Sequence, residues 1–217
     1  DAFDMPPVIL MTYNPTYYQK LIENYGFKKE KDLLAYILHH DTYASEKLTR
    51  MQQIVRDRKG ITIRALNFKD SKKFKADVKT LKEIYNAAWQ PNWGFVKMTD
   101  EEFDFLANDL KTIAEPRLTI IAEIKGKPVG FALSLPDINQ SLIYNKKGGI
   151  FGAVWCLFTK KKKIDLTRII VLGVLPEYQS SGIDAVLYHE IGETAFELGM
   201  PKGEASWILE DNEMMKR

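Results

Sequence analysis

The residues that suggest chemistry lie between Ile169 and Ala185, in the sequence IIVLGVLPEYQSSGIDA. An apolar run predicts a buried strand that ends at Pro176, and a helix is expected to begin at Gly182. A helix start offers unbonded backbone N–H groups and the positive end of the helix dipole, which both suit a phosphate group. A strand, a turn and a helix also meet where no ligand binds, so this pattern alone leaves both interpretations open.

The composition places the chain among ordinary folded proteins. Its 217 residues are enough for a large domain with a core, and 45% are hydrophobic and 28% charged. A net charge of +2 gives no reason to expect nucleic acid or a membrane as a partner. The single cysteine, Cys156, excludes an internal disulfide and favours a reducing compartment, so a cytoplasmic location is expected.

The elements around this turn follow a mixed α/β order. The segments expected to be strands are 61–66, 118–123, 129–134, 166–175 and 204–208, and those expected to be helices are 74–89, 99–110 and 182–198. The residues Thr99 to Glu102 have the pattern of a capping box. The segment 137–163 is less regular, and its apolar stretch Ile150–Phe158 is expected to pack in the core, with membrane contact as the alternative. The crossover through 182–198 should be right-handed.

The N-terminal part has its own strand and helix signals. A short strand is expected over 8–12, a helix from Asn14 to Tyr25, a strand over 32–39 and an amphipathic helix over 45–59.

The stretch from Val174 to Asp184 resembles the acyl-CoA signature of the GNAT superfamily of N-acetyltransferases, a strand with V-x-P-E-[YW] and then [RQ]-x-x-G-x-[GA]. The matching residues are Val174, Pro176, Glu177, Tyr178, Gln179 and Gly182. The order of elements over 61–217 agrees independently. The resemblance implies an α/β fold with a mixed sheet, in which strands 166–175 and 204–208 are neighbours that splay apart near Val174.

The resemblance also implies acetyl-CoA or another acyl-CoA as co-substrate. Backbone groups of Leu172 and Val174 would bind its pantetheine arm. The residues whose amides would cradle its diphosphate are Gln179, Ser180, Ser181, Gly182, Ile183 and Asp184, and Asn212 matches a further family position. The family usually has Gly or Ala where this chain has Asp184. That carboxylate suits a helix start but opposes a diphosphate.

The catalytic groups are not identified by the resemblance. Many members use a Glu as base and a Tyr as acid, and the candidates here are Glu123, Glu204, Tyr17 and Tyr18. The acceptor site would include Trp89, Trp93 and Phe95, for which core packing is the alternative. No metal site is expected, because the adjacent His39 and His40 face opposite ways on a strand.

The segment VILMTYNPTYYQKLIENYGF resembles the closing half of a GNAT domain. We therefore expect 1–43 to be the tail of a preceding repeat, 44–60 a linker helix, and 61–217 a GNAT-like domain that lacks its last elements. On this hypothesis 8–38 pack as strand-helix-strand and do not complete the sheet. The alternative is a permuted domain, in which 33–38 pair with 204–208 and Tyr17 or Tyr18 could supply the acid.

The resemblance implies an N-acyltransferase that moves an acetyl or acyl group directly from acyl-CoA to a primary amine, carried by a small molecule or a peptide. One alternative is a non-catalytic GNAT-like module that binds a ligand or a partner, and another is an aminoacyl-tRNA-dependent transferase. A partner could also be the remainder of a longer chain or a second copy.

Overall fold

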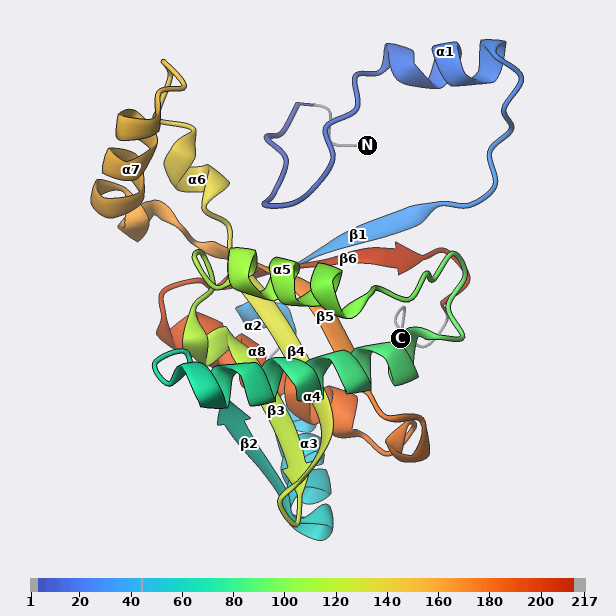
Figure 1. Cartoon of the computed structure of the whole chain (residues 1–217), viewed down its shortest axis with the longest axis vertical. Coiled ribbons are helices and arrows are strands. Elements are labelled where there is room, and N and C mark those ends of the chain that lie inside the picture. Colours follow the sequence, from blue (N-terminus) through green and yellow to red (C-terminus); the bar gives the residue numbers. More distant parts are fainter. Residues whose placement is uncertain (1–3, 44, 213–217) are drawn as a thin grey trace.

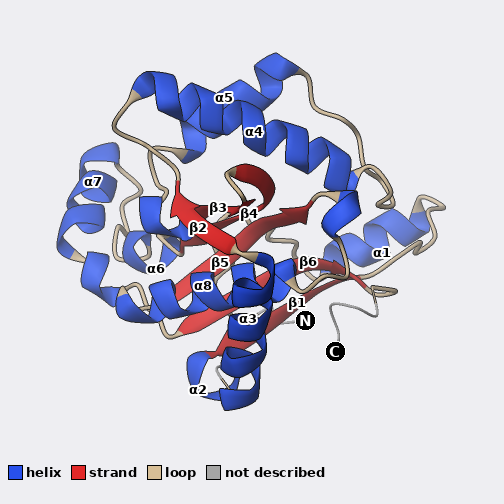
Figure 2. Ribbon diagram, turned by 90° about the horizontal axis from the view of Figure 1, so that it is seen from below, coloured by secondary structure: helices blue, strands red, loops and turns tan. Residues whose placement is uncertain are grey.

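The computed structural model describes residues 4–43 and 45–212, which form a six-stranded sheet between two helical layers (Figures 1 and 2). The strands are β1 (Leu33–His39), β2 (Ile61–Ala65), β3 (Thr119–Ile124), β4 (Lys127–Pro136), β5 (Leu166–Val174) and β6 (Lys202–Leu209). The α-helices are α1 (Tyr17–Asn24), α2 (His40–Tyr43), α3 (Glu46–Lys59), α4 (Ser71–Trp89), α5 (Asp100–Leu110), α6 (Asn139–Leu142), α7 (Ile150–Thr159) and α8 (Ile183–Glu197). The short 3₁₀ helices are η1 (Pro116–Leu118), η2 (Lys161–Lys163) and η3 (Pro176–Tyr178).

The strands lie in the order β1-β6-β5-β4-β3-β2. The pair β5 and β6 is parallel, and the other neighbouring pairs are antiparallel. The chain passes from β5 through α8 to β6, which is the predicted crossover. The sheet confirms the predicted mixed α/β fold.

Each face of the sheet buries its own apolar cluster. Strand β3 shows this by alternation: Ile120 and Ala122 belong to a cluster with Leu187 of α8, whereas Ile121 belongs to a cluster with Ile84 of α4. Figure 2 shows α4 and α5 on one side of the sheet and α3 and α8 on the other. Both faces are therefore covered, as expected where a parallel pair lies inside the sheet.

The start of α5 follows the predicted capping box. The Thr99 hydroxyl accepts from the Glu102 N–H, and the Glu102 carboxylate accepts from the Thr99 N–H.

The expected strand over 8–12 does not form. The Ile9 backbone bonds to side chains instead of a ladder: its N–H donates to Asp137 at 3.0 Å, and its carbonyl accepts from Arg168 at 2.7 Å. The Met11 N–H closes a turn by donating to the Val8 carbonyl. The Ile9 side chain is buried against Leu133 and Leu135 of β4. Two buried polar side chains thus compete successfully with strand pairing for this segment.

The expectation that 8–38 stay outside the sheet is wrong. Strand β1 pairs antiparallel with β6 from Leu33 opposite Leu209 to His39 opposite Lys202. This ladder satisfies the backbone groups that β6 would otherwise present as an edge. This pairing agrees with the alternative of a permuted domain. The origin of 1–43 in a preceding repeat stays a prediction.

The helix expected to be a linker, α3, is part of a helical layer. It packs against α8, where Arg56 forms an ion pair with Glu190 at 3.0 Å. Val55 reaches the start of α8, and a Cβ added to Gly182 would lie 3.1 Å from a Val55 methyl group. Gly182 also has a φ of 84°, which disfavours any residue with a Cβ.

The irregular segment 137–163 contains α6 and α7. The expectation that Ile150–Phe158 pack in the core is wrong, because most side chains of α7 are exposed and only Cys156 is buried. Figure 1 shows α6 and α7 projecting together at one corner of the molecule.

We predict that Gly182→Ala destabilises the protein more than Gly126→Ala does. Both glycines have a positive φ, of 84° and 75°, so each substitution should cost about 1–2 kcal/mol of backbone strain. Only Gly182 has a neighbour within 4 Å of the new Cβ, and this contact should add roughly 1 kcal/mol. Urea unfolding measures both values. Equal losses, or no recovery when Val55→Ala is combined with Gly182→Ala, would show that the α3 contact does not constrain this turn.

Candidate active site

An opening between β5 and β6 forms the centre of the candidate site. Their ladder runs from Leu166 opposite Lys202 to Ile169 opposite Ala205 and stops there. Strand β5 continues to Val174 without a partner on this side, while β6 stays paired with β1. The prediction that the two strands are neighbours is confirmed. They separate earlier than the expected Val174, since β6 follows β1 along its whole length.

The turn that joins β5 to α8 follows the part of β5 that has no partner on the β6 side. Within the described part of the chain, no hydrogen bond uses the backbone N–H groups of Ser180, Ser181 or Gly182. Ser180 takes a left-handed φ of 55°, and Gly182 precedes the first turn of α8, where N–H groups also lack helical acceptors. These residues fit an anionic group, such as a diphosphate, by backbone donation.

Some other residues expected to bind CoA have backbone or side-chain groups that are already occupied or buried. The Gln179 backbone N–H already donates to the Pro176 carbonyl, and the Gln179 side-chain amide donates to the Val174 carbonyl at 3.2 Å. This carbonyl is one of the Val174 backbone groups that the resemblance assigns to the pantetheine arm. Ile183 is fully buried in the core, so only its backbone could serve a ligand. Leu172 pairs with Ala132 of β4 on one side. On the other side, toward β6, it lies beyond the end of the ladder and has no strand partner.

Asp184 lies in the first turn of α8, near the unbonded amides. Burial, and then the nearby Asp184 carboxylate, raise the pKa of Tyr188 to about 12. Tyr188 therefore keeps its proton at neutral pH. Asp184 places a negative charge at the helix end where an anion would bind.

An apolar pocket of about 450 Å³ adjoins the opening from the side of α4 and α5. Ile170 and Val171 of β5 and Ser206 and Trp207 of β6 line it, and these are the residues just beyond the last paired ones. Its other lining side chains include Leu81, Tyr85 and Trp89 of α4, Phe103, Leu106 and Ala107 of α5, and Phe131 and Leu133 of β4. The volume is in the range of pockets that bind small molecules.

A buried polar network borders this pocket. The Arg168 guanidinium donates to the Ser206 hydroxyl at 3.0 Å and to the Ile9 carbonyl at 2.7 Å, and it lies 3.5 Å from the Glu204 carboxylate. Ser206 in turn donates to Glu204 at 2.8 Å. Burial lowers the pKa of Arg168, and Glu204 opposes this shift. Arg168 and Ser206 of this network thus line the largely apolar pocket where the two strands separate, and Lys111 at the end of α5 is a further charged lining residue.

The four candidate catalytic residues are scattered. Glu204 lies beside the pocket, in the network of Arg168 and Ser206. Glu123 lies on β3, separated from β5 by β4, and is paired with Arg64 at 2.7 Å. Tyr17 and Tyr18 lie on the exposed helix α1, where their rings contact each other.

The expected acceptor residues are also divided. Trp89 lines the pocket and stacks near Tyr85. Phe95 contacts the same Tyr85 ring but is not among the lining residues, and Trp93 is exposed under the Lys31 ammonium group. Asn212 follows β6, where its N–H donates to Leu209.

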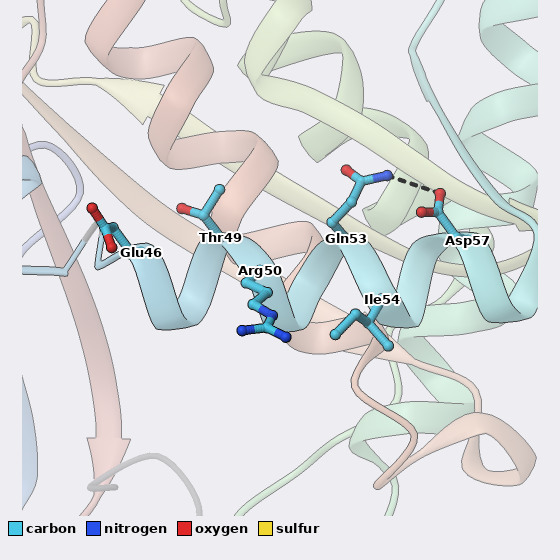
Figure 3. A pocket seen from close by; sticks show the side chains of 6 residues that line it. All are labelled: Glu46, Thr49, Arg50, Gln53, Ile54 and Asp57. Carbon is cyan, nitrogen blue, oxygen red and sulfur yellow. Dashed lines mark hydrogen bonds between the residues drawn. The ribbon is translucent and has the colours of Figure 1, made fainter.

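A second hollow, along α3, lacks the features of a reaction site. Its lining side chains all come from this one helix, and Gln53 donates to Asp57 within it (Figure 3). The described residues also include no group of three or more His, Cys, Asp and Glu side chains that could hold a metal ion.

Sequence reasoning missed Arg168 and Ser206. The signal for Arg168 was present, because a single arginine interrupts the apolar strand LTRIIVLGV. A charged residue in a central strand must find buried partners, and such partners often lie at sites. Ser206 carried no signal, since its role depends on which strand lies beside it.

No family model matches the chain. Two curated proteins are similar over nearly its whole length. Protein YghO of Escherichia coli is 33% identical over 220 residues, which cover 98% of this chain and 55% of that protein. A bacterial ceramide synthase of Caulobacter vibrioides is 31% identical over 227 residues, which cover 99% and 56%. The chain thus spans about half the length of the curated relatives it matches.

Solved structures are similar in fold. A GCN5-related N-acetyltransferase from Sphaerobacter thermophilus has a TM-score of 0.55 at 16% identity, over 92% of this chain and 49% of that one. A GCN5-related glucosamine N-acetyltransferase region of a fungal multi-domain enzyme has a TM-score of 0.57 at 11% identity, over 88% and 20%. Together with the sheet order and the opening between β5 and β6, these likenesses show that the chain has the fold of the GNAT acetyltransferases.

Proposed function

We propose that this protein transfers an acyl group from an acyl-CoA thioester to a primary amine. One observation carries the proposal: the part of β5 that has no partner on the β6 side begins with Ile170 and Val171, which line the apolar pocket, and leads at its other end into the turn whose amides are unbonded. A CoA thioester has an anionic diphosphate at one end and an acyl group at the other. The turn suits the diphosphate end, and the apolar pocket beside the opening is then left for the second substrate.

We propose further that one of the two substrates carries a long hydrocarbon chain. The pocket lining is dominated by apolar and aromatic side chains, which bind hydrocarbon through burial. One relative is named bacterial ceramide synthase, and a ceramide is the fatty amide of a long-chain amino alcohol. We therefore favour a long-chain amine as the acceptor, with its chain in the pocket and its nitrogen near Ser206.

The buried network offers a proton acceptor for this reaction. The amine nitrogen forms a bond to the thioester carbonyl carbon, the carbon–sulfur bond breaks, and the amine proton must leave. In our proposal Ser206 takes that proton while passing its own to Glu204, along the existing 2.8 Å hydrogen bond. The leaving thiolate takes a proton from solvent. Arg168 is a positioning residue that holds both side chains.

A non-catalytic ligand-binding module is the second candidate function, and Asp184 is the observation that favours it. A carboxylate beside the amides of the turn weakens the site for a diphosphate. Such a module would bind the long-chain molecule without turning over acyl-CoA.

We predict that Asp184→Asn tightens the binding of acetyl-CoA. Removing a like charge near the anion at a partly exposed helix end should gain roughly 1 kcal/mol, or about five-fold in Kd. Asp184→Gly should act in the same direction but also lower the helix stability by about 1 kcal/mol. Isothermal titration of both variants checks this. Unchanged or weaker binding would show that the turn does not contact the diphosphate.

We predict that Ala107→Trp selectively impairs long-chain acceptors. Ala107 lines the pocket, so an indole there should exclude a hydrocarbon chain and raise the KM for a long-chain amino alcohol at least about ten-fold. The KM for ethanolamine should change less than about two-fold. Ala76→Trp, on the exposed side of α4, is the matched control. An equal rise for both acceptors would mean that the chain does not enter this pocket.

We predict that Glu204→Gln lowers kcat by roughly 100-fold or more, the usual range for losing a general base. Glu123→Gln is the control, because it removes a carboxylate from a different strand. If both variants keep wild-type rates, the proton does not pass through Glu204.

A further inference from the structure

We propose that α7 attaches this protein to the surface of a membrane that contains anionic phospholipids. The proposal rests on the exposure and charge of one segment, Ile138–Ile164, and does not depend on the acyl transfer proposed above. It replaces the expectation, drawn from the net charge, that the protein has no membrane partner. The net charge is a sum over the whole chain and does not show where charged residues are concentrated.

The first observation is the exposure of large apolar side chains on α7. Ile150 is 79% exposed, Phe151 93%, Trp155 69% and Phe158 83%. These positions, together with the half-exposed Val154, recur at a spacing of four residues and share one side of the helix. Such a continuous apolar surface is unusual on a protein that contacts only water.

The opposite side of α7 is fixed to the protein. Cys156 is buried, and its carbonyl accepts from the buried Ser141 hydroxyl at 2.6 Å. Asn145 donates to the Gly149 carbonyl at the start of α7. The helix is therefore held in place while its apolar side faces outward, at the corner seen in Figure 1.

The second observation is the charge around this helix. Segment 138–164 contains six lysines and no Asp or Glu, although the whole chain has 29 acidic residues. The lysines lie on both sides of α7 in the sequence: Lys146 and Lys147 before it, and Lys160 to Lys163 after it. Lys146, Lys147 and Lys161 to Lys163 are exposed, while Lys160 lies over the Tyr144 ring at 5.6 Å.

These features together match an anionic lipid surface. Each lysine near such a surface contributes about 1 kcal/mol, and the apolar side chains enter the boundary between head groups and acyl chains. Trp155 and Tyr144 belong to the residue types that favour this boundary. At ten residues, α7 is about 15 Å long and must lie in the plane of the membrane. In the described part of the chain no helix has the length and apolar character to cross one.

A second copy of the chain is a less suitable partner for the apolar side of α7 than an anionic lipid surface is. Two α7 segments packed against each other would bring lysines of both copies together, with no carboxylate from either segment to pair with them. Anionic head groups supply the missing negative charge.

The test is sedimentation of the full-length protein with vesicles of phosphatidylcholine, alone and with roughly 30 mol % phosphatidylglycerol. We expect binding to the anionic vesicles, little binding to the neutral ones, and a decrease when salt rises from about 0.1 to 0.5 M. The double variant Phe151→Asp and Phe158→Asp should lower the partition coefficient at least about ten-fold. Replacing Lys160 to Lys163 by Gln should abolish the preference for anionic vesicles.

Phe105→Asp is the matched control, because Phe105 is an exposed phenylalanine on α5 outside the pocket lining. It should bind vesicles like the wild type, and circular dichroism should show that all variants fold. The proposal is overturned if the wild type does not bind anionic vesicles, or if the α7 double variant and the Phe105 variant bind equally. It is also overturned if the α7 double variant changes only the oligomeric state, since α7 would then be an interface between copies.

Discussion

The buried guanidinium of Arg168 must find hydrogen-bond acceptors inside the protein, and much of the structure follows from this need. Its partners come from segments far apart in the sequence: the Ile9 carbonyl, the Ser206 hydroxyl and the Glu204 carboxylate. Meeting them draws the N-terminal segment across β4 and β5 and gives that segment an irregular path. A charge that is paired in this way avoids the large penalty of an isolated buried ion. The same network gives the pocket its polar end.

The two halves of the candidate site obey different physical rules. The turn after β5 presents backbone donors, so its chemistry depends on conformation and tolerates changes of side chain, with Asp184 as the exception. The pocket depends on side-chain volume and apolar surface. Both lie along the part of β5 that has no partner on the β6 side, because β6 follows β1 and leaves β5 beyond Ile169. The sheet topology therefore positions both halves of the candidate site.

Local signals predicted the local parts of this structure. The strand, turn and helix around Pro176 and the capping box at Thr99 follow from short patterns, and both are present. The long-range parts carried no such signal. The apolar run LLAYILH does not by itself indicate its partner, and the pairing of 33–38 with 204–208 was available only as an alternative from the family resemblance. An apolar helix such as α7 has the same pattern whether it faces a core or the outside. Arg168 could have been singled out as a charge within an apolar strand, but its partners could not.

The pairing of β1 with β6 affects how the protein is made. Strand β1 is among the first parts of this segment to leave the ribosome, whereas its partner lies some 170 residues later, from Leu33 to Leu209. Until β6 has been synthesised, an apolar strand has no ladder to join and is open to pairing with other nascent chains. The sheet therefore closes late, and a contact between such distant segments slows folding. Residues 33–39 are therefore a segment to which a chaperone would usefully bind during translation.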